Sequence, residues 1–321
     1  MRGHFPHAFL RAAALAAGFA IAGSALALDS IKIMVPANPG GGWDTTGREL
    51  GKAMLAAGSA KNIQYENKGG AAGAIGLAQF VSASKGDPNA LMMGGMVMIG
   101  GTIQNKSAVT LEQVTPIARL TSEFEVVVVP ASSPIKDLKD LMAKFKADPG
   151  SISWGGGSAG GTDHILAGLL AKEVGVEPGK VNYVPFKGGG EAVAAIIGGH
   201  VSAGISGVSE FAQHIQSGKM RALGVSSPTK VANIPTLKEQ GFNVELANWR
   251  GIFGAPGITK EQQAALVKVV EAGTKSKSWE ETLQRQDWTA FWLPGDQYGA
   301  FIQSETKRIG EILAGLNLGK K

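Results

Sequence analysis

The chain has 321 residues, of which 44% are hydrophobic and 18% are charged, so it is long enough to form a globular protein of about two domains. It contains no cysteine, which excludes disulfides and any metal or nucleophile chemistry based on thiolates. The formal net charge is only +5, and no basic stripe with interleaved aromatic residues occurs, so nucleic acid is not an expected partner.

The first 27 residues are typical of a secretory signal peptide. Arg2 and Arg11 are followed by the apolar run AAALAAGFAIAG, and ALA at 25–27 supplies a cleavage site after Ala27. An N-terminal membrane anchor is the alternative, but the apolar run is shorter than the ~20 residues that span a bilayer. We therefore expect a soluble mature chain in the periplasm. Without Arg2 and Arg11, the 31 basic residues become 29 against 26 acidic ones, a net charge of +3.

Strands alternate with helices along the mature chain, which predicts a mainly parallel α/β arrangement. In the first part we expect strands at 31–35, 62–66 and 90–95 and helices near 44–57 and 73–84. A strong strand beginning at residue 125 then runs into the segment PASSP at 130–134, which indicates a domain boundary.

Beyond this boundary the alternation restarts. We expect helices at 135–147, 162–174, 190–197 and 208–216 and strands at 151–154, 181–186, 201–205 and 220–225. After a linker-like stretch at 226–236 and the segment ANWRGIFGAPG, the rest is predicted to be helical, over 259–276, 278–286 and 294–316. No strand-rich module accompanies these last helices, so they are expected to pack on the first sheet.

The predicted domains are therefore 28–128 with 246–321 for domain 1, which is discontinuous, and 129–245 for domain 2. Two crossings of the chain between the domains predict a hinge. The cleft between the domains is the expected ligand site.

Four of the predicted strand-to-helix junctions carry runs of glycine: NPGGGWDT, NKGGAAGAIG, WGGGSAGGTDH and FKGGGEA. The first turn of a helix has N–H groups without partners and the positive end of the helix dipole, and glycine lets a ligand approach this backbone closely. In an open parallel sheet such junctions lie at the carboxyl ends of the strands, where ligands bind. The loops predict an anion site between the domains, with Asp44 as the N-cap of the first helix; tight turns without a ligand are the alternative.

Two sharper motifs overlap the third glycine run. The segment GGSAG matches the nucleophile elbow of serine hydrolases with Ser158 as nucleophile, but Asp163 and His164 are expected to point apart on one helix, and no HGGG-like segment precedes them. The later histidines, His200 and His214, are the remaining candidates for a catalytic base. An exported serine hydrolase is therefore kept as the alternative function.

The same run, through Gly155, Gly157 and Gly160, matches the dinucleotide fingerprint, which is weak evidence in the middle of an exported, glycine-rich chain. The five histidines include no pair with ligand spacing, so a zinc site is improbable and no cofactor is expected.

An ordered series of segments resembles the periplasmic solute-binding proteins of tripartite tricarboxylate transporters, the TctC or Bug family. The segments are VPANPGGGWDTTGR, ENKGGAAGAIG, SWGGGSAGGTDHILAGLL, YVPFKGGGEAVAAIIGGHVSAGI, GKMRALGVSS, IPTLKEQGF and WRGIFGAPGI. The resemblance runs over nearly all of the mature chain. It implies a two-domain α/β fold like that of other periplasmic binding proteins, with a ligand cleft that closes between the domains.

The resemblance also implies the residues that contact the ligand, mostly through backbone amides and hydroxyls. They are Ala37, Asn38, Gly41, Gly42 and Asp44 in the first loop and Ser158, Thr162, Asp163, Lys187, Gly188 and Gly189 in the facing loops.

Many relatives have an aromatic residue where Ala37 stands and a small one where Trp43 stands, so Trp43 is either a lid over the ligand or a core anchor for the following helix. Lys187 is either a charge in the cleft or a solvated surface lysine. Arg250 is a candidate pocket cation, whereas Arg48 is expected to pair on its helix.

The function implied is that of a receptor, not an enzyme, which closes on a small carboxylate. A di- or tricarboxylate is expected, and the triple glycine before Trp-Asp resembles the citrate-type members. The expected partner is a membrane permease with one large and one small subunit, and the receptor is expected to be a monomer. A receptor that signals instead of delivering its ligand has the same features and stays an alternative.

Overall fold

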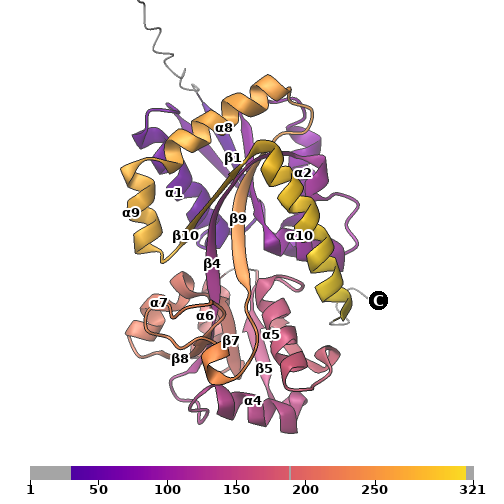
Figure 1. Cartoon of the computed structure of the whole chain (residues 1–321), viewed down its shortest axis with the longest axis vertical. Coiled ribbons are helices and arrows are strands. Elements are labelled where there is room, and N and C mark those ends of the chain that lie inside the picture. Colours follow the sequence, from indigo (N-terminus) through magenta and orange to yellow (C-terminus); the bar gives the residue numbers. More distant parts are fainter. Residues whose placement is uncertain (1–29, 188, 316–321) are drawn as a thin grey trace, which may run out of the picture.

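The protein consists of two lobes joined by two long strands (Figure 1). The structure is a computed structural model that describes residues 30–187 and 189–315. The predicted signal peptide with its cleavage site after Ala27, and the predicted site residue Gly188, lie outside the described residues. No helix in the described part of the chain is long and apolar enough to cross a membrane.

The first lobe contains the N-terminal alternation of strands and helices together with the C-terminal helices. Its elements are β1 (Ile31–Val35), α1 (Gly42–Ala56), β2 (Ile63–Asn67), α2 (Ala74–Ala83), β3 (Ala90–Gly95), α3 (Met96–Gln104), α8 (Lys260–Thr274), α9 (Lys277–Arg285), β10 (Thr289–Pro294) and α10 (Gly295–Gly315). Helices α8 and α9 pack on α1, where the Ser59 hydroxyl donates to the carbonyl of Val269 and the Thr282 hydroxyl donates to Glu49. Helix α10 packs on α3 and β4, so the end of the chain covers the first lobe (Figure 1).

The second lobe repeats the alternation between the two long strands. Its elements are α4 (Leu138–Ala147), β5 (Ser153–Gly156), α5 (Thr162–Glu173), β6 (Asn182–Pro185), α6 (Gly189–Ile197), β7 (Ala203–Gly207), α7 (Val208–Gln216) and β8 (Met220–Val225). Short 3₁₀ helices in the two lobes are Ala71–Gly73, Leu111–Gln113, Pro149–Ser151, Pro178–Lys180 and Lys238–Gln240.

The long strands β4 (Thr115–Pro130) and β9 (Ala247–Gly254) connect the lobes (Figure 1). The strand order is β2-β1-β3-β9-β4-β7-β5-β6, with β8 and β10 also paired to β4. Strand β4 pairs with β9 up to Phe124 and with β7 and β8 from Glu125 and Val126 onwards. The change of partners therefore occurs at Phe124 and Glu125, a few residues before the boundary predicted at 128 and 129.

The sheet is mixed, not mainly parallel as predicted. The pairs β1–β2, β1–β3, β5–β6 and β5–β7 are parallel, but every pair that includes β4 or β9 is antiparallel. The sequence patterns predict no strand at 247–254 or 289–294 and no helix at 96–104. The apolar pattern of strand β9 is interrupted by the buried polar residues Asn248 and Arg250, which is why it was missed. Helix α3 was missed because it follows β3 directly, without a capping side chain or a turn that would mark its start.

Candidate functional site

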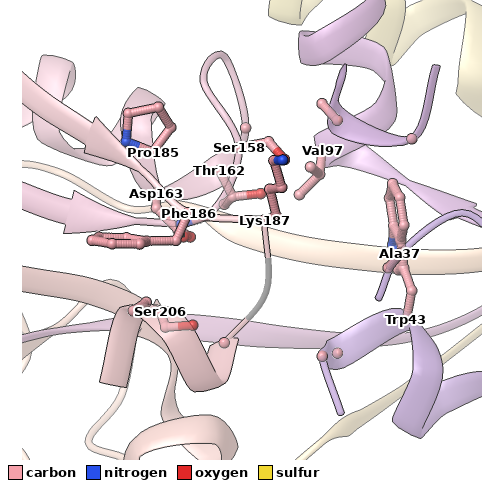
Figure 2. A pocket seen from close by; sticks show the side chains of 18 of the residues that line it. Ala37, Trp43, Val97, Ser158, Thr162, Asp163, Pro185, Phe186, Lys187 and Ser206 are labelled. Atoms are coloured by element: carbon pink, nitrogen blue, oxygen red, sulfur yellow. The ribbon is translucent and has the colours of Figure 1, made fainter. Parts of the chain in front are cut away.

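A cavity of about 340 Å³ lies between the lobes, and most of the predicted site residues line it. Figure 2 shows side chains of Ala37, Trp43 and Val97 on the first-lobe side and those of Ser158, Thr162, Lys187 and Ser206 on the second-lobe side. The predicted residues that line the cavity are Ala37, Asn38, Gly41, Gly42, Trp43, Ser158, Thr162, Asp163, Lys187 and Gly189. Asp44 is not among the lining residues.

The side chain of Asp44 holds the first glycine loop in place through hydrogen bonds, although Asp44 does not line the cavity. Its carboxylate accepts hydrogen bonds from the Gly40 amide at 3.0 Å, from Arg48 Nε at 3.0 Å and from Asn67 Nδ2 at 2.9 Å. Burial alone would raise the pKa of Asp44, but these hydrogen bonds hold it below its ordinary value. Arg48 pairs on its helix as expected, whereas the prediction that Asp44 caps α1 is wrong, because the N-cap is Gly41.

Helix α1 therefore begins at the cavity, with Gly41 as N-cap and Gly42 as its first residue. Its first amides have no carbonyl partner four residues back, so they and the helix dipole favour an acceptor or an anion at this point. Glycine is needed at Gly42, because a Cβ there would clash with the Arg250 guanidinium and stand 2.8 Å from Glu210 Oε1.

Trp43 is a buried core residue, as one of the two readings of the sequence predicts, and its role as a lid over the ligand stays a prediction. Trp43 is 8% exposed and belongs to the larger hydrophobic cluster, and it also lines the cavity. A Cβ on Gly73 would stand 2.7 Å from the indole, so the second glycine loop closes over the ring.

The second-lobe loop that precedes α5 is fixed by three side chains. The Gly157 amide donates to Asp163 Oδ2 at 2.6 Å, the Gly160 amide donates to His164 Nδ1 at 3.1 Å, and the Tyr183 hydroxyl donates to the Gly157 carbonyl at 2.9 Å. The imidazole of His164 stacks on the Tyr183 ring with 4.2 Å between the centroids. Burial lowers the pKa of His164 to about 4, so the ring is neutral and its Nδ1 is free to accept.

Helix α5 starts at the opposite wall from α1. Gly161 is its N-cap, and Thr162 is fully buried with no hydrogen-bond partner for Oγ1. Helix α6 begins at Gly189 on the same wall. Lys187 is exposed and lines the cavity from the second-lobe side, as Ser158 does (Figure 2).

Charged residues gather at the lobe junction; Arg250 and Asp163 among them were predicted, whereas Glu123, Glu125 and Glu210 were not. Arg250 on β9 forms an ion pair with Glu123 on β4, and both side chains are 3% exposed. Arg250 Nη2 is also 3.8 Å from a carboxylate oxygen of Glu210 on α7. Burial lowers the pKa of Arg250 to about 9. Arg250 lines the cavity as the sequence suggested, but its charge is taken up by Glu123.

Three further carboxyl groups at this junction have raised pKa values. Burial raises the pKa of Glu125 well above its ordinary range, and the neighbouring Asp163 and Glu210 charges raise it further. Burial raises the pKa of Asp163 to about 7. Burial also raises the pKa of Glu210, although hydrogen bonds from Ser206 and the Gly42 amide oppose this effect. Acidic residues spread over β4, α5 and α7 give no local sequence signal, which is why sequence reasoning missed Glu125 and Glu210.

The serine-hydrolase arrangement is not present in the described part of the chain. No hydrogen bond there joins Ser158 to a histidine, and the nearby His164 Nδ1 is occupied by the Gly160 amide. Asp163 accepts from the Gly157 amide and does not orient a histidine. The described residues also include no group of three or more histidine and carboxylate side chains that could hold a metal ion.

Comparison with known proteins finds relatives whose similarity extends over most of this chain. Protein BugT of Bordetella pertussis is 27% identical over 285 residues, covering 87% of this chain and 86% of that one. A UPF0065 protein in the gbd 5' region of Cupriavidus necator is 28% identical over 196 residues, and this chain spans 59% of its length.

Solved structures share the fold. The periplasmic binding protein BugD superposes with a TM-score of 0.81 at 22% identity, covering 90% of this chain and 98% of that one. MatC of Rhodopseudomonas palustris with bound malate gives 0.78 at 22% identity over 89% and 99% of the chains, and an R. palustris protein with adipate gives 0.80 at 20% identity over 90% and 98%. The predicted α/β fold of the periplasmic-binding-protein type is confirmed.

The family model described as tripartite tricarboxylate transporter family receptor, TctC, matches residues 52–318. The family and the structural neighbours are substrate-binding proteins, not enzymes, so the hydrolase alternative is set aside. The chain belongs to the TctC family of tripartite tricarboxylate transporter receptors.

Proposed function

We propose that this protein is a periplasmic solute-binding receptor that closes on a small di- or tricarboxylate and delivers it to a tripartite tricarboxylate transporter with one large and one small membrane subunit. The observation that carries the proposal is that helices α1 and α5 begin at opposite walls of one cavity. Related structures with malate and adipate support a carboxylate as the ligand.

The energetics favour a site made of backbone amides. Burying a carboxylate without partners costs several kcal/mol, so a cleft that closes must supply donors. Each hydrogen bond to a charged acceptor contributes roughly 1.5–3 kcal/mol, so several amides from the two walls offset the desolvation. Amides at helix starts are held in place by the fold, which keeps the ordering cost low.

The proposed contacts are those that the family resemblance implied, with Trp43 added and without Asp44, which holds the first loop in place and does not line the cavity. They are Ala37, Asn38, Gly41, Gly42, Trp43, Ser158, Thr162, Asp163, Lys187, Gly188 and Gly189. We further propose that the lobes act as domains 28–128 with 246–321 and 129–245, and that β4 and β9 are the hinge between them.

A thermal-shift screen of the mature protein against aliphatic and aromatic mono-, di- and tricarboxylates tests this function. A true ligand raises the melting temperature in a concentration-dependent way, because it binds only the folded state. Calorimetric titration then gives the stoichiometry, which we expect to be one. If no small carboxylate raises the melting temperature at millimolar concentration, the proposal is wrong.

A further inference from the structure

The start of helix α1 already has a carboxylate beside it, which comes from the other lobe. The N-cap, Gly41, has no side chain that could cap the first turn. Instead, the Gly42 amide donates a hydrogen bond to the carboxylate of Glu210, which lies on α7 of the second lobe. The N–H groups and the dipole at a helix start stabilise a negative charge. Glu210 therefore occupies one of the positions at which the carboxylate of the proposed ligand would bind.

The Glu210 carboxylate has further neighbours that hold it in this position. The Ser206 hydroxyl donates to its Oε2 at 2.8 Å, and Arg250 Nη2 lies 3.8 Å from its Oε1. A Cβ on Gly189, the first residue of α6, would stand 2.9 Å from the same Oε2, so the carboxylate also packs against the start of α6. The carboxylate thus has donors from both lobes, as the ligand would have.

A second cavity, of about 310 Å³, offers the Glu210 side chain another position. Gly42, Gly189 and Glu210 line both this cavity and the ligand cavity, so Glu210 stands between the two. Its side chain is 20% exposed, so it is not fixed in a closely packed core. His214 lines the second cavity and follows Glu210 by four residues on α7, which places both on the same helix face. An imidazole N–H at this point can donate to a carboxylate that has left α1.

We propose that Glu210 is an internal competitor of the ligand: the ligand carboxylate takes the Gly42 amide by displacing the Glu210 carboxylate into the second cavity, beside His214. The inference rests on the proposed function and adds a two-position switch to it. Two carboxylates repel each other at close range and cannot share one N–H donor, so the two occupants of the α1 start exclude one another.

The competition has a consequence for delivery. The free energy needed to move Glu210 is subtracted from the binding free energy of the ligand, so the affinity is lower than the contacts with the ligand alone would give. When the ligand leaves, the Glu210 carboxylate returns to α1 and replaces it as the acceptor. A receptor that has to release its ligand to a transporter gains from such an internal replacement.

Calorimetric titration of the parent and of Glu210→Gln at pH 8 tests the competition. The probes are malate, adipate and citrate, or the tightest-binding carboxylate of the thermal-shift screen where these three do not bind. Glutamine keeps the shape and an oxygen for the Ser206 hydroxyl, but it lacks the charge that favours the start of α1. We expect the tightest-binding probe to bind Glu210→Gln roughly fivefold tighter than the parent, or more.

The exposed Glu177→Gln on the same lobe is the matched control for loss of a charge and should leave the affinity unchanged. Equal or weaker binding of the probe to Glu210→Gln than to the parent would overturn the inference.

A histidine variant separates displacement from simple charge repulsion. His214→Ala removes the donor at the second position, so we expect it to weaken binding of the probe roughly threefold or more in the parent. In Glu210→Gln no charge has to be moved, so adding His214→Ala should change the affinity little. His200→Ala, at an exposed histidine of the same lobe, is the control. An equal loss from His214→Ala in the parent and in Glu210→Gln would contradict displacement toward His214.

A crystal structure of the parent with the tightest-binding probe tests the switch without any variant. We expect the Gly42 amide to donate to the probe and the Glu210 carboxylate to lie in the second cavity, near His214. A structure in which Glu210 still accepts from the Gly42 amide while the probe is bound would show that the two do not compete.

The outcomes separate the inference from the function. Binding of a probe with equal affinity to the parent and to Glu210→Gln leaves the proposed receptor function in place and removes the inference. Binding of no carboxylate to either protein contradicts the receptor function and the inference together.

Discussion

Gly41 is the residue at which the start of α1 meets the cavity. It is the N-cap of the helix, its backbone is extended, and a Cβ at this position would have only the Asn38 carbonyl oxygen within 4 Å, at 3.9 Å. A larger side chain therefore fits the fold but occupies the space beside the loop amides.

The variant Gly41→Val is accordingly expected to lose at least tenfold in ligand affinity, about 1.4 kcal/mol, with a melting temperature close to that of the parent. Calorimetry and thermal unfolding check the two parts. Gly179→Val is a control far from the cavity, with an ordinary φ and only Glu177 Oε1 nearby, at 3.9 Å. Unchanged affinity in Gly41→Val would mean that the loop is only a turn.

The Arg250–Glu123 ion pair is the most deeply buried one among the described residues. Arg250→Met leaves Glu123 as a buried charge without its cation, so we expect a loss of about 3–5 kcal/mol in the free energy of unfolding by urea. Lys260→Met removes a pair with Asp296 in which both side chains are largely exposed, and it should cause no measurable change. If the two variants lose the same free energy of unfolding, burial does not determine how much these ion pairs contribute to stability.

Asp163 and His164 make stability depend on pH with opposite signs. The pKa of Asp163 is raised to about 7, so between pH 4 and 7 the folded state holds a proton that the unfolded state has lost, and stability falls as pH rises. The pKa of His164 is lowered to about 4, so its contribution to stability is lost as pH falls below about 6.5.

Comparison of the parent with Asp163→Asn isolates the first effect, because His164 is present in both. The variant should become more stable relative to the parent as pH rises from 4 to 7, as measured by urea unfolding at several pH values. A stability difference that is independent of pH would show that the pKa of Asp163 is not raised in the folded protein.

At the scale of elements, most strands and helices could be predicted from local hydrophobic patterns in the sequence. Strands 31–35, 90–95 and 220–225 and helix 208–216 were predicted with the bounds that the structure has. Each combines a clear hydrophobic period with glycine or polar residues at its ends. Strand β9 and the first half of β4 were missed because their polar residues are satisfied by partners far away in the sequence, which no local pattern contains.

Some parts of the candidate site could also be predicted from local sequence patterns, and others could not. The glycine loops were predictable because a strand followed by glycines and a helix is a local signal. The capping residue of α1 and the carboxyl groups of Glu125 and Glu210 were not predictable, because Asp44 bonds to Asn67 on β2 and the carboxyl groups meet only in the folded protein.

Helix α3 of the first lobe contacts the α5 loop of the second through Gly100. A Cβ on Gly100 would clash with the Gly160 carbonyl oxygen, so Gly100→Ala is expected to keep the lobes from approaching as closely as they do here. We predict at least tenfold weaker ligand binding and a larger radius of gyration by small-angle scattering in the presence of ligand. Gly310→Ala in α10 meets only Ile103 Cδ1, at 3.9 Å, and is the matched control. Parent-like closure in Gly100→Ala would contradict this contact.

At the scale of the whole molecule, the protein is two lobes connected by two strands of one continuous sheet (Figure 1). One hydrophobic cluster contains buried residues of both lobes, such as Leu50 of α1 and Leu141 of α4, and a second cluster lies wholly in the second lobe. The cavity lies between the lobes beside strand β9, so we expect closure of the lobes to bury the ligand.

A crystal structure of the protein with its tightest-binding carboxylate tests the central claim most directly. We predict that the carboxylate lies in the cavity between the lobes and accepts hydrogen bonds from backbone amides at the starts of both α1 and α5. A ligand bound outside this cavity, or held by side chains of one lobe alone, would contradict the account.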